Sequence, residues 1–236
     1  MADVLTATGL CMRYHTALAL DNLNLTLPEG KIVGLLGPNG SGKTTFIKLA
    51  AGLLTPTAGS VTVCGKPIGP ESKAVVSYLP DRTYFRRQMR VSQMLDFFQD
   101  FYQDFDRKRA EEMLAQLGIQ PSASFRSLSK GTQEKVQLVL VMSRRARLYL
   151  LDEPIGGVDP AARDYILNTI LSNYDPSATI LISTHLIADV ERVLDEYIFL
   201  CGGRIVRGGN ADAAREETGK SLDELFREVF RCLPNC

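Results

Sequence analysis

A glycine-rich segment at residues 37–44, with the sequence GPNGSGKT, constrains this chain more than any other feature. An apolar run at residues 31–36 precedes it, and a periodic apolar stretch that includes Phe46 and Ile47 follows it, so the segment is expected to join a buried strand to a helix. In that context it fits the P-loop pattern, in which backbone N–H groups and a helix N-terminus surround phosphate oxygens. The residues expected to contact a nucleotide are Gly37, Pro38, Asn39, Gly40, Ser41, Gly42, Lys43, Thr44 and Thr45.

Two side chains at the end of the P-loop (residues 37–44) carry its chemistry. Lys43 is expected to reach the β- and γ-phosphates of a nucleotide, and Thr44 to offer its hydroxyl to Mg²⁺. An ordinary glycine-rich turn would account for the glycines, but it would not need a Lys-Thr pair at the start of a helix. The sequence therefore predicts a site for a nucleoside triphosphate and Mg²⁺.

Polar residues follow two further apolar strands, at residues 148–151 and 179–182. Asp152 is expected to hold Mg²⁺ through water, and Glu153 to orient or deprotonate the attacking water. A single acidic residue here would often cap a helix, but two adjacent carboxylates in a chain with a P-loop favour catalysis. His185 should lie at the same carboxyl edge of a parallel sheet, where we expect it to contact the γ-phosphate.

The order of the apolar runs predicts an α/β fold. Short alternating runs over residues 3–35 are typical of antiparallel strands, whereas the later strands, separated by a helical stretch near 160–172, predict a parallel sheet. Helical periodicity dominates residues 81–147. The predicted division of this single domain, residues 1–236, is an α/β core at about 1–80 and 148–210, a helical subdomain at about 81–147, and a C-terminal helix at about 221–231 that opens with a Ser221–Glu224 capping box.

Composition and charge narrow the classes of partner. The chain has 27 Lys and Arg and 27 Asp and Glu, so its zero formal net charge predicts no general attraction for nucleic acid. Apolar runs such as residues 136–142 fall short of the roughly 18 residues of a membrane span, and the first residues lack a signal-peptide pattern, so a cytoplasmic location is expected. Irregular spacing argues against a disulfide framework. Most of the five cysteines are expected to be buried or surface thiols, and no metal is assigned to them; they are Cys11, Cys64, Cys201, Cys232 and Cys236.

A further motif, LSKGT at residues 128–132, decides which P-loop proteins the chain resembles. Together with the P-loop, the loop at Asp81, the Asp152-Glu153 pair and His185, it completes five elements in the order found in ATP-binding subunits of ABC transporters. Essentially the whole chain resembles that family. The resemblance implies a P-loop NTPase fold with a RecA-like core, an N-terminal antiparallel β subdomain and an inserted helical subdomain. It also implies ATP hydrolysis with Mg²⁺.

The resemblance implies roles for residues outside the P-loop as well. Tyr14 would stack on adenine, although an aromatic residue beside a strand can equally belong to the core. Ser129 and Gly131 would bind the γ-phosphate held by a second chain, and Asp159 would communicate across that dimer. Since Ser129 and Gly131 begin a helix, they form an anion site with no anion of their own chain. The expected partner is a second ABC ATPase chain, in a head-to-tail homodimer or heterodimer.

Two positions depart from the family pattern. Asp81 stands where the family usually has Gln; its carboxylate can bind Mg²⁺, but it cannot donate a hydrogen bond. Lys130 and Thr132 replace the usual Gly and Gln of the signature, and Lys130 either contacts nucleotide in the partner's site or points to solvent. Both variations resemble a bacterial branch tied to drug and antimicrobial-peptide export.

Arginines cluster directly after Asp81, between residues 82 and 90, beside Tyr84 and Phe85. A solvated loop is one interpretation, and the family resemblance offers another by placing this loop next to membrane subunits. The expected function is an ATP-hydrolysing subunit, peripheral at the inner face of the cell membrane, that drives separate integral membrane permease subunits. The transported molecule and its direction depend on the permease.

Two other functions fit part of the pattern. A soluble ABC ATPase that acts on nucleic acid or ribosomes would usually carry two cassettes or basic extensions, which this chain lacks. A P-loop kinase of small molecules would need an acceptor pocket and a lid, but no signature at residues 128–132. Phosphorylated acceptor or free phosphate as product separates the kinase from the ATPase.

Overall fold

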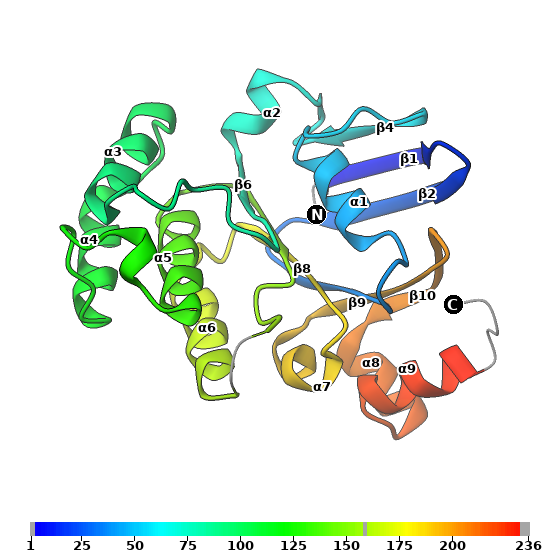
Figure 1. Ribbon diagram of the computed structural model, residues 1–236. Helices are drawn as coiled ribbons and strands as arrows, with labels where there is room; N and C mark the ends of the chain where they lie inside the picture. Colours follow the sequence, from blue (N-terminus) through cyan, green and yellow to red (C-terminus); the bar gives the residue numbers. More distant parts are fainter. Residues whose placement is uncertain (1–2, 158–159, 232–236) are drawn as a thin grey trace.

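The computed structural model describes residues 3–157 and 160–231, which form two β-sheets and a group of helices (Figure 1). The strands are β1 (Asp3–Tyr14), β2 (Ala17–Pro28), β3 (Ile32–Leu36), β4 (Ala58–Val63), β5 (Lys66–Pro67), β6 (Val76–Leu79), β7 (Leu148–Asp152), β8 (Thr179–Thr184), β9 (Glu196–Cys201) and β10 (Arg204–Asn210). The α-helices are α1 (Lys43–Ala50), α2 (Pro70–Ala74), α3 (Val91–Phe101), α4 (Arg107–Gln116), α5 (Lys130–Met142), α6 (Pro160–Asn173), α7 (Ile187–Val190), α8 (Ala211–Thr218) and α9 (Leu222–Arg231).

The larger sheet is mainly parallel and has the strand order β10-β9-β3-β8-β7-β6. All its neighbours pair in parallel except β10, which returns antiparallel along β9. The smaller sheet, in the order β2-β1-β4-β5, is antiparallel. These arrangements confirm the predicted α/β fold with an N-terminal antiparallel β part.

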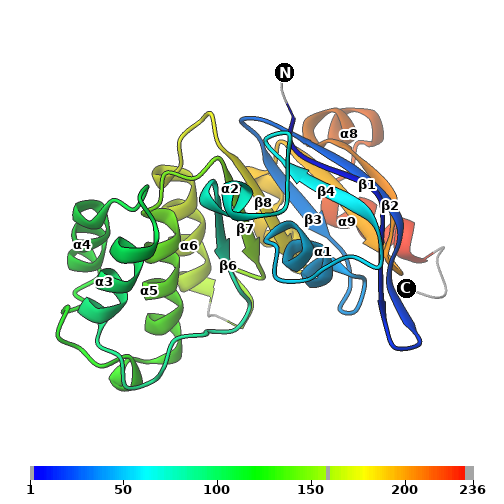
Figure 2. The same ribbon diagram turned by 90° about the horizontal axis from the view of Figure 1, so that it is seen from above.

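Both faces of the parallel sheet are buried, which explains why its strands are continuous apolar runs. Along β3, Val33 and Leu35 pack with α1 and the antiparallel sheet, whereas Ile32 and Leu36 pack on the opposite face. Figure 2 shows α1 lying between the two sheets. Packing on both faces of the parallel sheet therefore fixes the position of its carboxyl edge.

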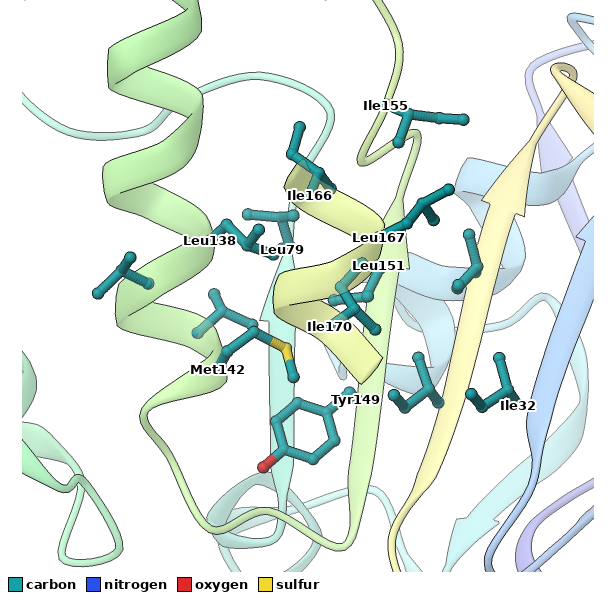
Figure 3. Packing of buried hydrophobic residues seen from close by; sticks show 14 of the residues in the cluster. Ile32, Leu79, Leu138, Met142, Tyr149, Leu151, Ile155, Ile166, Leu167 and Ile170 are labelled. Atoms are coloured by element: carbon teal, nitrogen blue, oxygen red, sulfur yellow. The ribbon is translucent and has the colours of Figure 1, made fainter. Parts of the chain in front are cut away.

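Helices α5 and α6 cover the other face of the sheet, and Figure 3 shows their apolar side chains meeting those of β7. Met142 of α5 and Ile170 of α6 lie against Tyr149 and Leu151. The Tyr149 hydroxyl donates a hydrogen bond to the carbonyl of Arg144 within this core. This packing fixes β7, whose end carries two of the predicted catalytic residues.

The segment that joins β6 to α3 differs from the sequence prediction. Residues 80–90 contain no helix, and α3 begins only at Val91. The backbone of this segment pairs instead with a distant one: Phe125 N–H donates to the carbonyl of Met89, and Arg126 N–H to that of Arg87. Extended pairing of this kind uses the groups that a helix would need, and hydrophobic periodicity does not reveal it.

The C-terminal helix α9 carries the predicted capping box and docks on the body of the protein. Ser221 N–H donates to the Glu224 carboxylate at 2.9 Å, and Glu224 N–H donates to the Ser221 hydroxyl at 3.1 Å, which is a complete capping box. Phe226 and Phe230 pack against Phe199 of β9. Within residues 3–157 and 160–231, no helix is long and apolar enough to cross a membrane.

The cysteines follow the prediction only in part. Cys11 and Cys64 are free thiols, but Cys201 is disulfide-bonded and is not one of the expected thiols. Irregular spacing excludes a repeated disulfide framework, but it does not exclude one bond between residues that the fold brings together. Cys232 and Cys236 lie outside the described residues.

Candidate functional site

Four parallel strands place the predicted site residues at one edge. The P-loop follows β3, His185 follows β8, and Asp81 comes after β6, while Asp152 is the last residue of β7 and Glu153 directly follows it. In the sheet these strands are neighbours in the order β3-β8-β7-β6, and Asp152 lies directly beside Ser183. Residues far apart in the sequence therefore converge because parallel strands end at a common edge.

Two glycines are needed for the shape of the P-loop. Gly42 has a φ of +110°, a conformation that L side chains rarely adopt, and a Cβ there would lie 2.6 Å from the carbonyl oxygen of Ala19. A Cβ at Gly37 would lie 2.4 Å from the carbonyl oxygen of Leu200. The loop can therefore pass between β2 and β9 and enter α1 only without side chains at these positions.

Lys43 is almost completely buried beneath the P-loop. Its ammonium donates to the carbonyls of Gly37 at 2.7 Å and Pro38 at 3.1 Å, and lies 3.5 Å from the Glu153 carboxylate. Burial lowers the pKa of Lys43, and the charge of Glu153 opposes this effect. A phosphate in the pocket would give the ammonium a stronger counter-charge.

Asp152 lies beside the P-loop with only one carboxylate oxygen satisfied. Its Oδ1 accepts from the hydroxyls of Ser183 at 2.6 Å and Thr44 at 3.0 Å, while its buried Oδ2 has no hydrogen-bond partner. Burial raises the pKa of this carboxyl, and the two hydroxyl donors oppose the rise. The buried Ser41 hydroxyl oxygen also lacks a partner. Unsatisfied buried oxygens beside a buried ammonium fit a bound phosphate and Mg²⁺.

Glu153 lies between Lys43 and His185. Its φ of +50° is unusual for a residue with a side chain, and its backbone N–H is held by the carbonyl of Ser183 at 3.0 Å. The carboxylate accepts from Thr184 Oγ1 at 3.0 Å and lies 3.1 Å from Nδ1 of His185. The turn thus aims the carboxylate at the phosphate end of the pocket.

A pocket of about 510 Å³ lies at this edge of the sheet and is lined by Lys43 and Glu153, whereas Asp152 does not line it and reaches it through its hydrogen bond with Thr44. Asp81 lines it together with Glu153 and His185, so the structure brings the three together as the sequence predicted. Tyr14 is exposed and does not line this pocket. Its remaining lining residues are Ala19, Asn39, Gly40, Gly42, Lys43, Thr44, Thr45, Lys130, Gly156 and Gly157.

The signature residues lie at the start of α5. The Ser129 side chain caps this helix by accepting from Thr132 N–H at 3.2 Å, and neither Ser129 nor Gly131 lines the pocket of its own chain. Lys130 does line that pocket, and its ammonium lies over Gly157 and 3.7 Å from Glu134. Asp159 lies outside the described residues.

Sequence reasoning missed two hydroxyl residues that organise the site. Ser183 bonds Asp152, and Thr184 bonds Glu153, both from the end of β8. Their position directly before His185, at the end of a predicted strand, could have indicated a role in the site. Hydroxyl residues are common at strand ends, however, and the sequence pattern does not show which residues they hydrogen-bond.

The comparison with family models matches residues 20–156 to the family described as "ABC transporter". The match includes the P-loop, Asp81, the signature and Asp152-Glu153, and it covers more than half of the chain. The chain belongs to the ABC transporter family. The domain that it contains is the ATP-binding domain of this family, a type of domain that hydrolyses ATP.

Relatives and solved structures agree with this assignment. An ABC transporter ATP-binding protein of Synechocystis is 32% identical over 86% of this chain, which spans only 59% of that relative. The protein YtrB of Bacillus subtilis is 31% identical over 84% of this chain and 69% of its own length. The daunorubicin resistance protein DrrA3 of Streptomyces coeruleorubidus is 29% identical over 97% of this chain and 76% of its own length.

A solved ATP-binding subunit of an ABC transporter superposes with a TM-score of 0.86 at 29% identity, over 96% of this chain and 99% of that structure. A dimeric cassette in a post-hydrolysis state with ADP and Pi, MJ0796, reaches 0.76 at 21% identity, over 87% of this chain and 98% of its own. The second likeness shows a shared fold. The names of the three relatives describe ABC transport or drug resistance, and none points to a role on nucleic acid.

Proposed function

We propose that this subunit binds ATP and Mg²⁺ in the pocket at the carboxyl edge, completes each site with a second cassette chain, and drives a separate integral membrane permease from the inner face of the cell membrane. The observation that carries the proposal is the convergence of a buried ammonium and a Glu-His pair in one pocket, with the half-satisfied carboxylate of Asp152 hydrogen-bonded to Thr44 of its lining. Each of these groups has a use in phosphoryl transfer to water.

The P-loop and Lys43 would hold the phosphates of ATP. Lys43 already points into the pocket, and the Ser41 hydroxyl has no partner that a phosphate would have to displace. Thr44, Asp152 and Asp81 are the residues that would hold Mg²⁺. When bound, Mg²⁺ neutralises charge on the β- and γ-phosphates.

Glu153 would act on the attacking water, because its carboxylate is aimed at the phosphate end of the pocket. His185 lies 3.1 Å from that carboxylate and lines the same pocket, where it would contact the γ-phosphate. Tyr14 would stack on adenine outside the described pocket. Its exposure leaves its ring free to do so.

A second chain would supply the signature. Ser129 and Gly131 lie outside the pocket of their own chain, and a Cβ at Gly131 would meet nothing within 4 Å, so the start of α5 presents an open surface. In a head-to-tail dimer, Ser129 and Gly131 would face the γ-phosphate held by the partner, whereas Lys130 would lie between that surface and the pocket of its own chain, which it lines. Asp159 would carry information between the two sites.

Mixing variants tests the shared site. Lys43→Ala removes the phosphate contact, and Ser129→Arg blocks the signature. If each site takes its signature from the partner, a mixture forms some dimers with one intact site, and ATP hydrolysis partly returns. If both elements act within one chain, every site keeps a defect and mixing restores nothing. A radioactive ATP filter assay on the mixture shows whether nucleotide binding returns with hydrolysis.

The permease would dock in a second pocket, of about 810 Å³, between the core and the helical part; we call this second pocket the groove. Exposed apolar side chains line it, including Leu53, Tyr84 and Phe97, with Arg82 beside them. Phe85, which sequence reasoning placed in this groove, is instead buried against Phe98 and Phe125, so that expectation is wrong.

Asp81 connects the two pockets. It lines the nucleotide pocket and also the groove, as does Thr44. A change in the position of Asp81 upon Mg²⁺ binding would therefore alter the surface that a permease contacts. This shared wall is the physical route by which ATP binding would move the membrane subunits.

A further inference from the structure

Three groups contact the Glu153 carboxylate: Lys43 at 3.5 Å, His185 at 3.1 Å and the Thr184 hydroxyl at 3.0 Å. Two of the three have another use once ATP is present. Lys43 is placed to bind phosphate, and His185 lines the pocket next to the γ-phosphate position. Thr184 alone of these three does not line the pocket, so it can keep its contact with Glu153 throughout the reaction.

The direction of the Thr184 hydrogen bond is set by its surroundings. Its Oγ1 accepts from the backbone N–H of Leu186 at 3.0 Å, which leaves the hydroxyl proton for the Glu153 carboxylate. Thr184 is completely buried at the end of β8, where its backbone pairs with Leu36 of β3. A β-branched side chain in such a strand has little rotational freedom, so the donor is held in place.

Glu153 needs such a holder because its backbone is in the left-handed region, with a φ of +50°. This conformation is costly for a residue with a Cβ, by about 1 kcal/mol, and it persists where neighbouring groups fix it. The N–H of Glu153 is fixed by Ser183, and its side chain by Thr184. Consecutive residues of β8 thus fix both ends of the same glutamate.

We propose that Thr184 is a positioning residue for hydrolysis: its hydroxyl holds the Glu153 carboxylate toward the attacking water after Lys43 and His185 turn to the phosphates. This inference rests on the proposed role of Glu153 as the group that acts on the water. Thr184 transfers no proton itself. Its loss should reduce the rate of the chemical step and leave ATP binding intact.

The test uses the full chain and measures kcat and KM for ATP with Mg²⁺, together with Tm. Thr184→Val keeps the shape but removes the hydroxyl, and we expect kcat to fall by about 10- to 100-fold, the range for one hydrogen bond to a charged group. KM should stay within about twofold of the parent value. Thr184→Ser, which restores the hydroxyl, should recover most of kcat.

Thr179→Val is the matched control. Thr179 is equally buried on β8 and its hydroxyl bonds a backbone carbonyl, that of Pro28, far from Glu153. This variant should lose stability comparable to Thr184→Val while keeping kcat. An equal loss of kcat in both variants would overturn the proposal, because the effect would then come from the strand and not from Glu153.

Glu153→Gln separates this inference from the function that it rests on. In the Glu153→Gln background, single-turnover hydrolysis should show no further loss on adding Thr184→Val, since both changes disable one unit. A full additional loss in the double variant would overturn the positioning role while leaving Glu153 in its own. Normal hydrolysis by Glu153→Gln alone would overturn both the role of Glu153 and the positioning role of Thr184.

Discussion

Replacing Asp152 by Asn should make the nucleotide-free protein more stable, although it disables the site. Asp152 is buried with an unpartnered Oδ2, and only Oδ1 accepts hydrogen bonds, from Thr44 and Ser183. Asn keeps an oxygen for these two donors and removes the buried charge. The amide N–H₂ of Asn takes the unpartnered place of Oδ2, so a neutral buried group without a partner, which costs about 1–3 kcal/mol, replaces a charged one, which costs more. Only the difference between these two costs is relieved, so we expect the free energy of unfolding to rise by about 1 kcal/mol, which corresponds to roughly 2–4 °C in Tm for a chain of this size.

Urea unfolding in EDTA without nucleotide measures this change, and Asp100→Asn on the exposed face of α3 is the control, expected within about 0.5 kcal/mol of the parent. Because burial raises the pKa of Asp152, deprotonation costs the folded state more than the unfolded state, and parental stability falls as pH rises through that pKa. The difference in free energy of unfolding between Asp152→Asn and the parent should thus become smaller as the pH is lowered. An Asp152→Asn protein less stable than the parent at neutral pH would show that the buried charge of Asp152 does not destabilise the folded state.

The order of stability should reverse with ATP and Mg²⁺, because the parent gains binding energy that the variant lacks. Ligand at 100 times its Kd stabilises a protein by about 2.7 kcal/mol. Repeating the unfolding at saturating ATP and Mg²⁺ checks this, with Mg²⁺ omitted as the control. Equal stabilisation of both proteins by Mg²⁺ would show that Asp152 does not hold the metal.

Three further predictions concern hydrolysis, coupling and folding. Glu153→Gln should keep ATP affinity, measured by filter binding, but hydrolyse ATP about 10²–10⁴ times more slowly. Tyr84→Ala, but not Leu171→Ala, should lower the membrane-bound fraction in cells that contain the permease, because both residues are exposed but only Tyr84 lines the groove; equal fractions would place the docking surface elsewhere. Arg144→Leu should lower the free energy of unfolding by about 3–5 kcal/mol in urea, since it leaves Asp104 without its ion-pair partner; a change under 1 kcal/mol would contradict this.

The local motifs of this site could be predicted from the sequence because each depends on residues close together in the chain. The P-loop, Asp152-Glu153 and His185 each follow an apolar run, and parallel strands bring their ends to one edge. The alternation of β3 between two buried faces also follows from its apolar residues. Each of these elements is determined by residues close together in the chain, and contacts with distant residues do not change it.

Other features depend on contacts between distant residues, which one sequence does not reveal. Arg144 is fully buried because its guanidinium bonds Asp104 and the carbonyl of Ala74 and stacks on Tyr102. In the sequence it is one of several basic residues before β7, with nothing to distinguish it. Phe85 is likewise adjacent in sequence to the exposed Tyr84, yet only Phe85 is buried in the core. There it packs against Phe98 of α3 and Phe125.

If two chains share each ATP site, the Glu153→Gln protein should form a dimer in ATP, and its mass in solution shows whether it does. This variant should bind ATP without consuming it, so that the shared sites stay filled. Multi-angle light scattering after gel filtration in ATP should then give about twice the chain mass of 26.0 kDa, and the single-chain mass in ADP or after adding Ser129→Arg. A protein that binds ATP fully and still has a mass of 26.0 kDa would show that each chain completes its ATP site alone.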